Sequence, residues 1–382
     1  MPELNRALLV GSGGVGTMVA FNIEASGLGR VAAVLRSNYT KVLQEGFEID
    51  SCEHGSIKGW RPSEGEHTYS LYCPVFVLEL VNGNVCPLVL KEIPTTSDIP
   101  WDYIIVVTKN VPDIPPTVTD MIAPAVTPGH TAILLIQNGL NIERPILERF
   151  PNNVCLSGIS MIGSQEESPG VIKHYDVDLL ILGAFRNPNI SRDGEVASAK
   201  RFAGMYTAQC ETRCRFVEDV QNSRWEKLVY NACWNSICAL TDMDTGRIRL
   251  TDHAVQTLVR PAMEEIRAAA RVHGVNLPAE LCDRMLELDP LTMYYQPSML
   301  VDMRKGKFIE VENIIGEPLA AGTARGVPMP TLNVLYNLLK AKQWATKEKL
   351  GMLEIPPGGD YLTQRSFPKQ KAHTRPVEES SL

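Results

Sequence analysis

The hydrophobic pattern of the first 140 residues alternates short apolar runs with longer stretches of helical spacing. The apolar runs cover 7–10, 31–35, 104–107 and 132–136. Continuous runs of this length are typical of strands that are buried on both faces of a sheet. Strands that alternate with helices predict an α/β fold with a doubly wound, parallel sheet. Ligands of such sheets bind beyond the carboxyl ends of the strands.

The pattern changes twice further along the chain. Residues 153–184 read as strands around a polar loop, which predicts an antiparallel extension of the sheet. From Ser198 to about Lys349 the spacing is helical. A chain of 382 residues is long enough for two domains. We therefore predict a doubly wound domain over 1–210, an all-helical C-terminal domain over 211–350, and a tail over 351–382.

A glycine-rich turn joins the first predicted strand to the first predicted helix. In the pattern G-x-G-x-x-G, the first glycine permits the tight turn, the second lets the backbone approach a pyrophosphate, and the third lets the helix pack close to the strand. The N–H groups at the helix N-terminus then face the anion. A purely structural turn is the alternative, but the flanking elements favour a Rossmann-type dinucleotide site, which we assign to Gly11, Ser12, Gly13, Gly14, Val15 and Gly16.

The residues after the second predicted strand bear on the choice of dinucleotide. NAD sites usually carry an acidic residue there, which binds the ribose 2′-hydroxyl. This chain has Arg36, Ser37 and Asn38 instead. Arg36 could be a solvated residue at a strand end, but a guanidinium with two small polar neighbours suits a 2′-phosphate. We therefore predict NADP(H) as the cofactor, bound in part by Arg36.

Composition and charge exclude several other classes of protein. The net charge is −7 and no dense run of Lys or Arg is present, so we expect no nucleic-acid partner. The nine cysteines form no C-x-x-C pair and no cluster at zinc spacing, which predicts no metal site and reduced thiols, as in the cytoplasm. No apolar run approaches the ~20 residues of a membrane helix. The helical half could support a homodimer.

Polar residues that could carry chemistry fall in three places. Lys109 and Asn138 follow two apolar strands, where they could face a ligand or simply be solvated. Lys227, Asn231 and Asn235 are spaced i, i+4 and i+8 in an otherwise apolar helical stretch, so they share one face. Buried polar groups need partners. Either a polar substrate in an interdomain cleft or a structural Lys–Glu pair with packed amides would supply them.

These pieces together resemble the ketopantoate reductase (2-dehydropantoate 2-reductase) family, and its longer fungal-type members in particular. The glycine turn alone is generic, whereas the Lys-x-x-x-Asn helix followed by a serine and a glutamate is much more diagnostic. The matching segments occur in the family's order, at 11–16, 107–109, 137–139, 225–232, 298–310 and 325–330.

The resemblance implies an active site between the two domains and assigns roles by matching position. Lys227 would be the general acid, and Glu310 would pair with or orient it. Ser298 would bind the substrate carboxylate, with Asn231 and Asn235 as further substrate contacts. Lys109 and Asn138 would lie near the nicotinamide and its ribose, and Arg36 matches the arginine for the 2′-phosphate. The implied reaction is NADPH-dependent reduction of a 2-oxo acid, 2-dehydropantoate (ketopantoate) first, to pantoate in pantothenate biosynthesis.

Departures from the family pattern fall on the substrate side. Tyr295 and Thr245 stand where close bacterial members carry asparagines, and Pro297 precedes Ser298 in place of a serine. The stretch 50–75 is longer than a minimal member needs and could alter the mouth of the cleft. A reductase for another branched or aromatic 2-oxo acid, of the D-2-hydroxy acid dehydrogenase type, is therefore the alternative enzyme. A dinucleotide-binding regulator without turnover is the alternative outside the enzymes.

Overall fold

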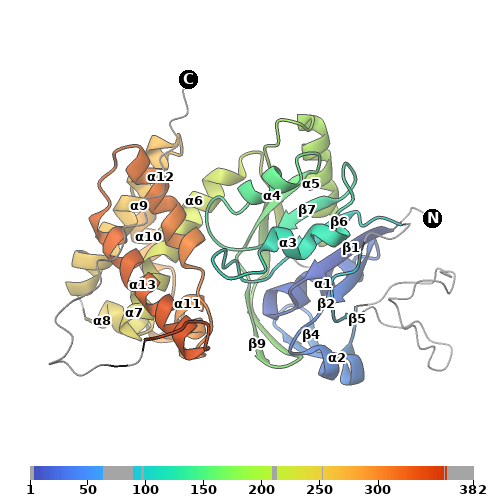
Figure 1. Ribbon diagram of the computed structural model, residues 1–382, viewed down its shortest axis with the longest axis horizontal. Coiled ribbons are helices and arrows are strands. Elements are labelled where there is room, and N and C mark those ends of the chain that lie inside the picture. Colours follow the sequence, from blue (N-terminus) through green and yellow to red (C-terminus); the bar gives the residue numbers. More distant parts are fainter. Residues whose placement is uncertain are drawn as a thin grey trace.

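The computed structural model has an α/β lobe and a helical lobe that lie side by side (Figure 1). It describes residues 4–62, 89–95, 99–208, 213–251, 253–356 and 358. Residues 63–75 of the long stretch 50–75, and nearly all of the predicted tail, lie outside the described residues. No helix in the described part of the chain is long and apolar enough to cross a membrane.

The main sheet of the α/β lobe has eight strands in the order β12-β11-β8-β7-β6-β1-β2-β5. Its neighbouring strands pair in parallel except β8 and β11, which pair antiparallel. The predicted doubly wound parallel sheet is therefore confirmed. Its strands are β1 (Asn5–Val10), β2 (Gly29–Val34), β5 (Val89–Leu90), β6 (Tyr103–Val106), β7 (Ala132–Leu135), β8 (Cys155–Ser160), β11 (Leu179–Phe185) and β12 (Arg213–Phe216).

Helices cover both faces of the main sheet because its central strands are apolar on both sides. Leu9 of β1 belongs to the core under α1 (Gly14–Ala25) and α5 (Arg192–Thr207). The next residue, Val10, points the other way and packs in the core that includes α3 (Val118–Ile122) and α4 (Arg144–Arg149). The carboxyl ends of β1, β6 and β7 thus open between layers of helices, toward the second lobe.

A second sheet has four strands in the order β4-β3-β10-β9 and corrects part of the prediction for 153–184. Strands β8 and β11 do form an antiparallel extension of the main sheet, but β9 (Gly163–Ser168) and β10 (Val171–Asp176) leave it. Strand β10 pairs in parallel with β3 (Phe47–Ser51), which also pairs with β4 (Gly55–Trp60). Buried and exposed residues alternate along β3, so its buried face needs this second sheet. The short helix α2 (Tyr39–Glu45) precedes β3.

The helical lobe begins at α6 (Val220–Tyr230), somewhat later than predicted. Strand β12 still belongs to the main sheet, because Leu179–Leu182 of β11 offer it a parallel edge. The pattern had predicted a helical segment at residues 213–216, and this prediction is wrong. The remaining elements of this lobe are η2 (Asn231–Asn235), α7 (Ser236–Thr241), α8 (Thr245–Leu250), η3 (Val255–Val259), α9 (Arg260–Val272), α10 (Leu281–Glu287), η4 (Leu291–Met293), α11 (Ser298–Arg304), η5 (Glu312–Gly316), α12 (Glu317–Ala324) and α13 (Pro330–Lys349).

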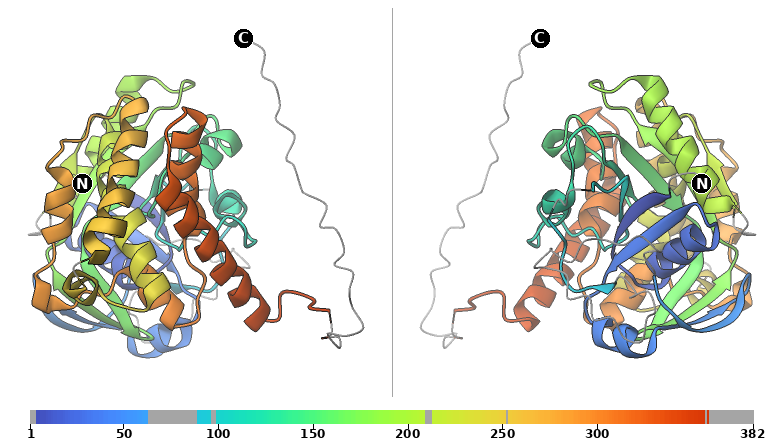
Figure 2. Two further views of the ribbon diagram at one scale, coloured as in Figure 1. Left: turned by 90° about the vertical axis from the view of Figure 1, so that its left-hand side faces the viewer. Right: turned by 90° about the vertical axis from the view of Figure 1, so that its right-hand side faces the viewer.

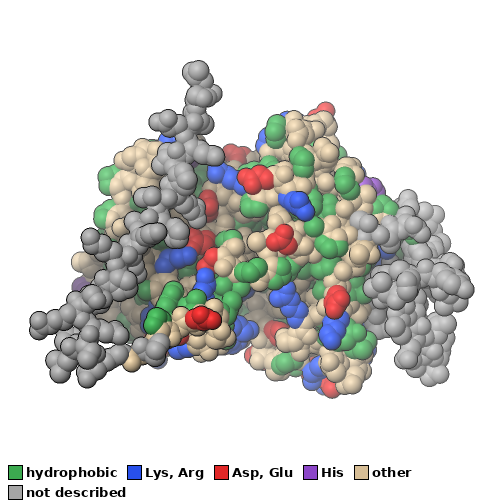
Figure 3. Space-filling view, viewed as in Figure 1, with side chains coloured by type: hydrophobic (Ala, Val, Ile, Leu, Met, Phe, Trp, Pro, Cys, Tyr) green, Lys and Arg blue, Asp and Glu red, His purple; other side chains and the backbone are tan. Residues whose placement is uncertain are grey.

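One continuous apolar core holds the helical lobe together. Trp234 of the π-helical turn η2, Ile266 of α9 and Leu339 of α13 are fully buried members of it. The long helix α13 crosses this lobe and buries Leu332, Leu335 and Leu339 on one face (Figure 2). On the face of the molecule in Figure 3, basic and acidic side chains are interspersed over both lobes.

Candidate active site between the lobes

The glycine turn has the geometry that its sequence predicted. Gly11 has a φ of +104°, and a Cβ there would lie 2.7 Å from the backbone nitrogen of Thr108. A Cβ on Gly16 would lie 1.9 Å from the carbonyl oxygen of Gly11, so only glycine lets α1 sit this close to β1. Gly13 is exposed, and a Cβ on it would meet nothing within 4 Å. The turn is therefore tight on its inner side and open on its outer side.

The residues around this turn fit the pyrophosphate of a dinucleotide. The hydroxyl oxygen of Ser12 is buried and has no hydrogen-bond partner among the described residues. It lies at the N-terminus of the 12-residue helix α1, where free backbone N–H groups and the helix dipole favour an anion. The next residue, Gly14, is covered, because a Cβ on it would meet the backbone of Gln165 in β9 at 2.6 Å, whereas Val15 is only partly buried.

Arg36 and Asn38 occupy the end of β2, where a ribose would lie in a Rossmann-type site. Arg36 is exposed, and its Nη2 lies 3.0 Å from the sulfur of Met121. Asn38 is buried and donates to the carbonyl oxygen of Ser12 at 3.0 Å and to Glu166 at 2.8 Å. Glu166 was missed by the sequence analysis because it comes from β9, far along the chain. Its Oε1 also accepts from the backbone N–H of Gly170.

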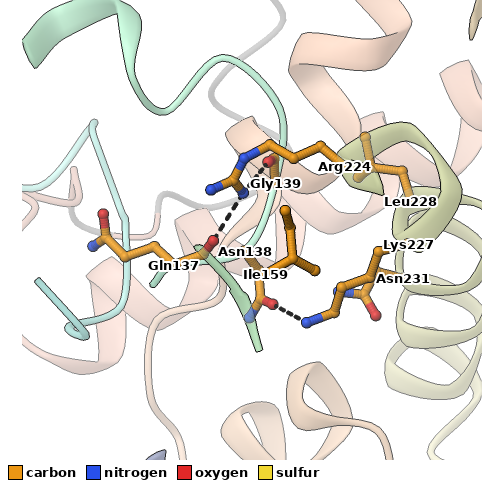
Figure 4. Close-up of a pocket in the computed structure, with 8 residues that line it drawn as sticks. All are labelled: Gln137, Asn138, Gly139, Ile159, Arg224, Lys227, Leu228 and Asn231. Atoms are coloured by element: carbon orange, nitrogen blue, oxygen red, sulfur yellow. Dashed lines mark hydrogen bonds between the residues drawn. The ribbon is translucent and has the colours of Figure 1, made fainter. Parts of the chain in front are cut away.

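Lys227 projects from α6 toward the α/β lobe (Figure 4). Its Nζ donates to Oδ1 of Asn138 at 3.0 Å and to the carbonyl oxygen of Ser160 at 2.7 Å. Burial, followed by the nearby charge of Arg224, lowers the pKa of Lys227 to about 8, although Glu310 opposes this shift. The amine is thus held between two neutral acceptors at the end of the sheet.

Asn138 links Lys227 to a cluster of charged groups from both lobes. Its Nδ2 lies 3.4 Å from Oε2 of Glu310, while its Oδ1 accepts from Lys227. Glu310 is buried, with 3% of its side chain exposed, and its carboxylate lies 3.5 Å from Nζ of Lys109. The backbone N–H of Asn110 donates to the same carboxylate at 3.0 Å. Lys109 also pairs with Asp302 of α11 at 2.6 Å.

Glu310 does not pair directly with Lys227, which was one of the two arrangements that the resemblance implied. Glu310 contacts Lys109 directly and reaches Lys227 only through Asn138. Among the described residues, no carboxylate forms an ion pair with Lys227, so the structural Lys–Glu alternative does not hold in that form. Burial lowers the pKa of Lys109, but the attraction of Glu310 and Asp302 outweighs burial and raises it overall.

The three residues implied to bind substrate lie at different depths. Asn231 lines a small cavity together with Lys227, Asn138 and Arg224 (Figure 4). Asn235 is buried but does not line that cavity, because the chain from Asn231 to Asn235 forms a π-helical turn that breaks the i, i+4, i+8 register. Ser298 is the first residue of α11 and is exposed. It lies one turn before Asp302, the partner of Lys109.

Two charged residues of the site were missed by the sequence analysis. Asp302 lies four residues after Ser298 and could have been found from helical spacing once Ser298 was chosen. Arg224 lies three residues before Lys227 on the same helix and is buried against Glu143. No pattern in the sequence indicates that Glu143 is the partner of Arg224. The described residues contain no group of three or more His, Cys, Asp or Glu side chains that could hold a metal ion.

The comparisons with known proteins agree with this geometry. A model of the family described as ketopantoate reductase PanE/ApbA matches residues 7–187, and the model of its C-terminal part matches 219–343. The chain belongs to the ketopantoate reductase family. It is 33% identical to an uncharacterized protein of Saccharomyces cerevisiae, over 92% of this chain and 97% of that protein. It is 26% identical to a 2-dehydropantoate 2-reductase of a Nostoc species, over 89% of this chain and 95% of the relative.

Several solved structures have the same fold as this chain. The 2-dehydropantoate 2-reductase of Geobacter metallireducens superposes with a TM-score of 0.71 at 27% identity, covering 88% of this chain and 99% of that one. A D-mandelate dehydrogenase solved with NADH and anilino(oxo)acetate superposes with a TM-score of 0.70 over 90% of this chain and 99% of that one, and at 19% identity it shows a shared fold alone. The Rossmann-like lobe followed by a helical lobe is therefore the architecture of ketopantoate reductases, an oxidoreductase family.

Proposed function

We propose that this protein reduces a 2-oxo acid to a 2-hydroxy acid with NADPH, and that 2-dehydropantoate is its first candidate substrate. The observation that carries the proposal is the position of Lys227. Its ammonium lies between the two lobes, at the carboxyl ends of the strands, and is joined through Asn138 to Glu310. Family membership supplies the reaction class, and this arrangement supplies its proton donor.

The chemistry requires a hydride at the carbonyl carbon and a proton at the carbonyl oxygen. The reduced nicotinamide supplies the hydride when the cofactor is bound. Lys227 donates the proton, and its charge stabilises the developing alkoxide in a site with little water. A pKa near 8 suits this task, because a general acid works best with a pKa near the working pH.

The other residues of the site hold the substrate and the cofactor. We propose that Asn231 and Asn235 contribute amides on the substrate side, and that Ser298 binds the carboxylate from the start of α11. We further propose that Lys109 and Asn138 lie near the nicotinamide and its ribose when the cofactor is bound. The cavity lined by Asn138, Lys227 and Asn231 is only about 10 Å³, roughly the room for one water molecule. Substrate entry therefore requires the lobes to separate, with rearrangement at Lys109 and Asp302.

The preference for NADPH rests on Arg36. Its guanidinium is exposed at the end of β2, and residues 36–39 contain no acidic side chain that would select a ribose 2′-hydroxyl. Glu166 lies close to this site, but its Oε1 accepts from Asn38 and Gly170. A cytoplasmic location and a homodimer remain predictions. One structural neighbour, the ketopantoate reductase of Staphylococcus aureus, is dimeric.

A specific observation keeps a second substrate class in consideration. Tyr295 and Thr245, two of the departures from the family pattern, are adjacent in space, because the N–H of Thr245 donates to the carbonyl oxygen of Tyr295 at 3.0 Å. The half-buried ring of Tyr295 replaces a short amide on the substrate side. An aromatic or larger branched 2-oxo acid is therefore the second candidate substrate class.

The test is NADPH oxidation with 2-dehydropantoate beside a panel of branched and aromatic 2-oxo acids. We expect turnover with 2-dehydropantoate and the highest kcat/KM for that compound. A higher kcat/KM for an aromatic oxo acid would move the assignment to the second class. A dinucleotide-binding regulator, in contrast, would bind NADPH and oxidise it with none of the panel.

A further inference from the structure

Arg224 forms a buried network that the proposed reaction has not used so far. Only 2% of its side chain is exposed, and none of the side chain of its partner Glu143 is. Nε of Arg224 lies 2.6 Å from Oε1 of Glu143 and 2.7 Å from the hydroxyl oxygen of Ser157. That hydroxyl donates to the same carboxylate oxygen at 2.6 Å. A buried ion pair is costly to form unless such hydrogen bonds complete it.

The guanidinium of Arg224 also forms hydrogen bonds to the backbone on both sides of Asn138. Nη1 donates to the carbonyl oxygens of Gln137 and Gly139, each at 3.0 Å, so it spans the residue between them (Figure 4). The loop is also held from its other side, because Gln137 donates to the carbonyl oxygen of Thr108 at 2.6 Å. Gly139 has a φ of +101° and packs directly on Asn313, so the backbone of the loop cannot shift toward Asn313.

We propose that Arg224 is a positioning residue of the reductase: with Glu143 it fixes the loop 137–139 so that the amide of Asn138 stays between Lys227 and Glu310. The proposal rests on the proposed function, in which Lys227 is the proton donor. Arg224 and Lys227 are one helical turn apart on α6, so one helix carries both the donor and the group that aligns its acceptor. A planar fork of donors can hold two carbonyls at once, whereas a lysine ammonium at this position cannot reproduce that geometry.

The charge of Arg224 acts on Lys227 as well. After burial, Arg224 is the largest influence that lowers the pKa of Lys227; Glu310 raises it and Lys109 lowers it further. The carboxylate of Glu143 offsets part of the charge of Arg224. Removing Arg224 and removing the charge of Glu143 should therefore move the pKa of Lys227 in opposite directions.

Four variants separate positioning from charge. Arg224→Lys keeps the positive charge but loses the planar set of donors that binds two carbonyl oxygens, and Arg224→Met loses both the charge and the donors. Glu143→Gln keeps an oxygen that accepts from Nε and loses the negative charge. Arg284→Met is the matched control, because Arg284 of α10 makes an exposed ion pair at 3.5 Å with Glu226, which lies on α6 as Arg224 does.

Two measurements decide the proposal without any need for turnover. Competitive acetylation across a pH series reports the pKa of Lys227, and hydrogen–deuterium exchange reports the loop through the peptide 136–142. We expect faster exchange in Arg224→Lys and Arg224→Met. The pKa of Lys227 should rise by about one pH unit in Arg224→Met, fall in Glu143→Gln, and stay unchanged in Arg224→Lys and Arg284→Met.

Kinetics adds the functional readout on the full-length enzyme. We expect kcat to fall roughly 10- to 100-fold in Arg224→Lys, with a smaller change in KM, because a small misplacement of a catalytic contact can cost this much. Wild-type exchange and a wild-type kcat in Arg224→Lys would overturn the proposal, and so would equal effects in Arg284→Met. If Arg224→Met fails to fold, Arg224→Lys and Glu143→Gln still decide it. If the wild-type protein turns over no 2-oxo acid, the proposed function fails, while labelling and exchange still report on Arg224.

Discussion

Lys227 should set the alkaline limit of oxo acid reduction, and this gives the sharpest test of the site. The group must be protonated to act as the acid, and its pKa is lowered to about 8, by burial above all. The protonated and neutral forms then stand at about ten to one at pH 7 and about one to ten at pH 9. We expect kcat/KM for the oxo acid to fall about tenfold per pH unit above pH 8.

Two substitutions identify the group responsible for that limit. In Lys227→Met the donor is gone, so kcat should fall by roughly 10²–10³, the usual cost of losing one preorganised donor to a developing oxyanion. In Lys227→Arg a cation remains at every accessible pH. That variant should keep part of the activity and lose the decline above pH 8. Because Lys109 has a raised pKa, it should not titrate in this range.

The assay is the initial rate of NADPH oxidation at pH 6–10 with saturating cofactor. NADPH affinity, measured by fluorescence in parallel, should change little in both variants, because Lys227 comes from the helical lobe and the glycine turn from the other. An alkaline decline with the same midpoint in Lys227→Arg would show that another group titrates. A Lys227→Met variant with near-normal kcat would refute Lys227 as the proton donor.

Three further predictions concern the α/β lobe. Arg36→Glu should lower the preference for NADPH over NADH by roughly 10- to 100-fold in kcat/KM, the value of one charge-assisted contact; an unchanged ratio would mean that Arg36 does not meet the 2′-phosphate. Gly16→Ala should lower both the melting temperature and NADPH affinity, since its Cβ would meet the oxygen of Gly11, whereas Gly13→Ala should lower affinity alone; equal thermal loss in both variants would contradict this. Burial raises the pKa of Asp178 to about 6 despite its hydrogen bonds from Tyr206 and Asn22. Protonated Asp178 adds about 2–3 kcal/mol at most to the free energy of unfolding. This contribution is complete below the pKa that Asp178 has in the unfolded chain and is lost as the pH rises through 6. Urea unfolding at pH 4.5 and at pH 7 should therefore show a smaller loss of stability with rising pH in Asp178→Asn than in the wild type.

The parts of the fold that the sequence predicted are those fixed by local pattern. The strands at 7–10, 104–107 and 132–136 are apolar on both faces, and only a sheet covered on both sides buries them. The need for glycine at Gly16 follows from a local contact with Gly11, whereas the residue that Gly11 abuts, Thr108, comes from a distant part of the chain. Pairings between distant segments could not be read. Nothing local says that β10 joins β3 in a second sheet, or that β12 returns to the main sheet after α5.

The site shows the same limit at the level of side chains. Helical spacing placed Lys227 and Asn231 on one face, and both line the same cavity. Helical spacing also placed Asn235 on this face, but residues 231–235 form a π-helical turn that changes the register. No residue type in this segment indicates such a turn. Glu310, which the resemblance assigned to the site, lies in the charged cluster beside Lys109. The resemblance did not give this direct partner, since a sequence match does not show which of two lysines a carboxylate faces.

The distribution of charge explains why Lys227 can give up a proton. Two lysines and two carboxylates meet between the lobes, and both carboxylates are within ion-pair distance of Lys109. Lys227 is left with the carbonyl of Ser160 and the amide of Asn138, both neutral. Neutral acceptors orient an ammonium without adding the stabilisation that a direct carboxylate would give, so burial prevails and the pKa falls toward neutrality. A direct Glu310–Lys227 pair would have raised the pKa and made the proton harder to transfer.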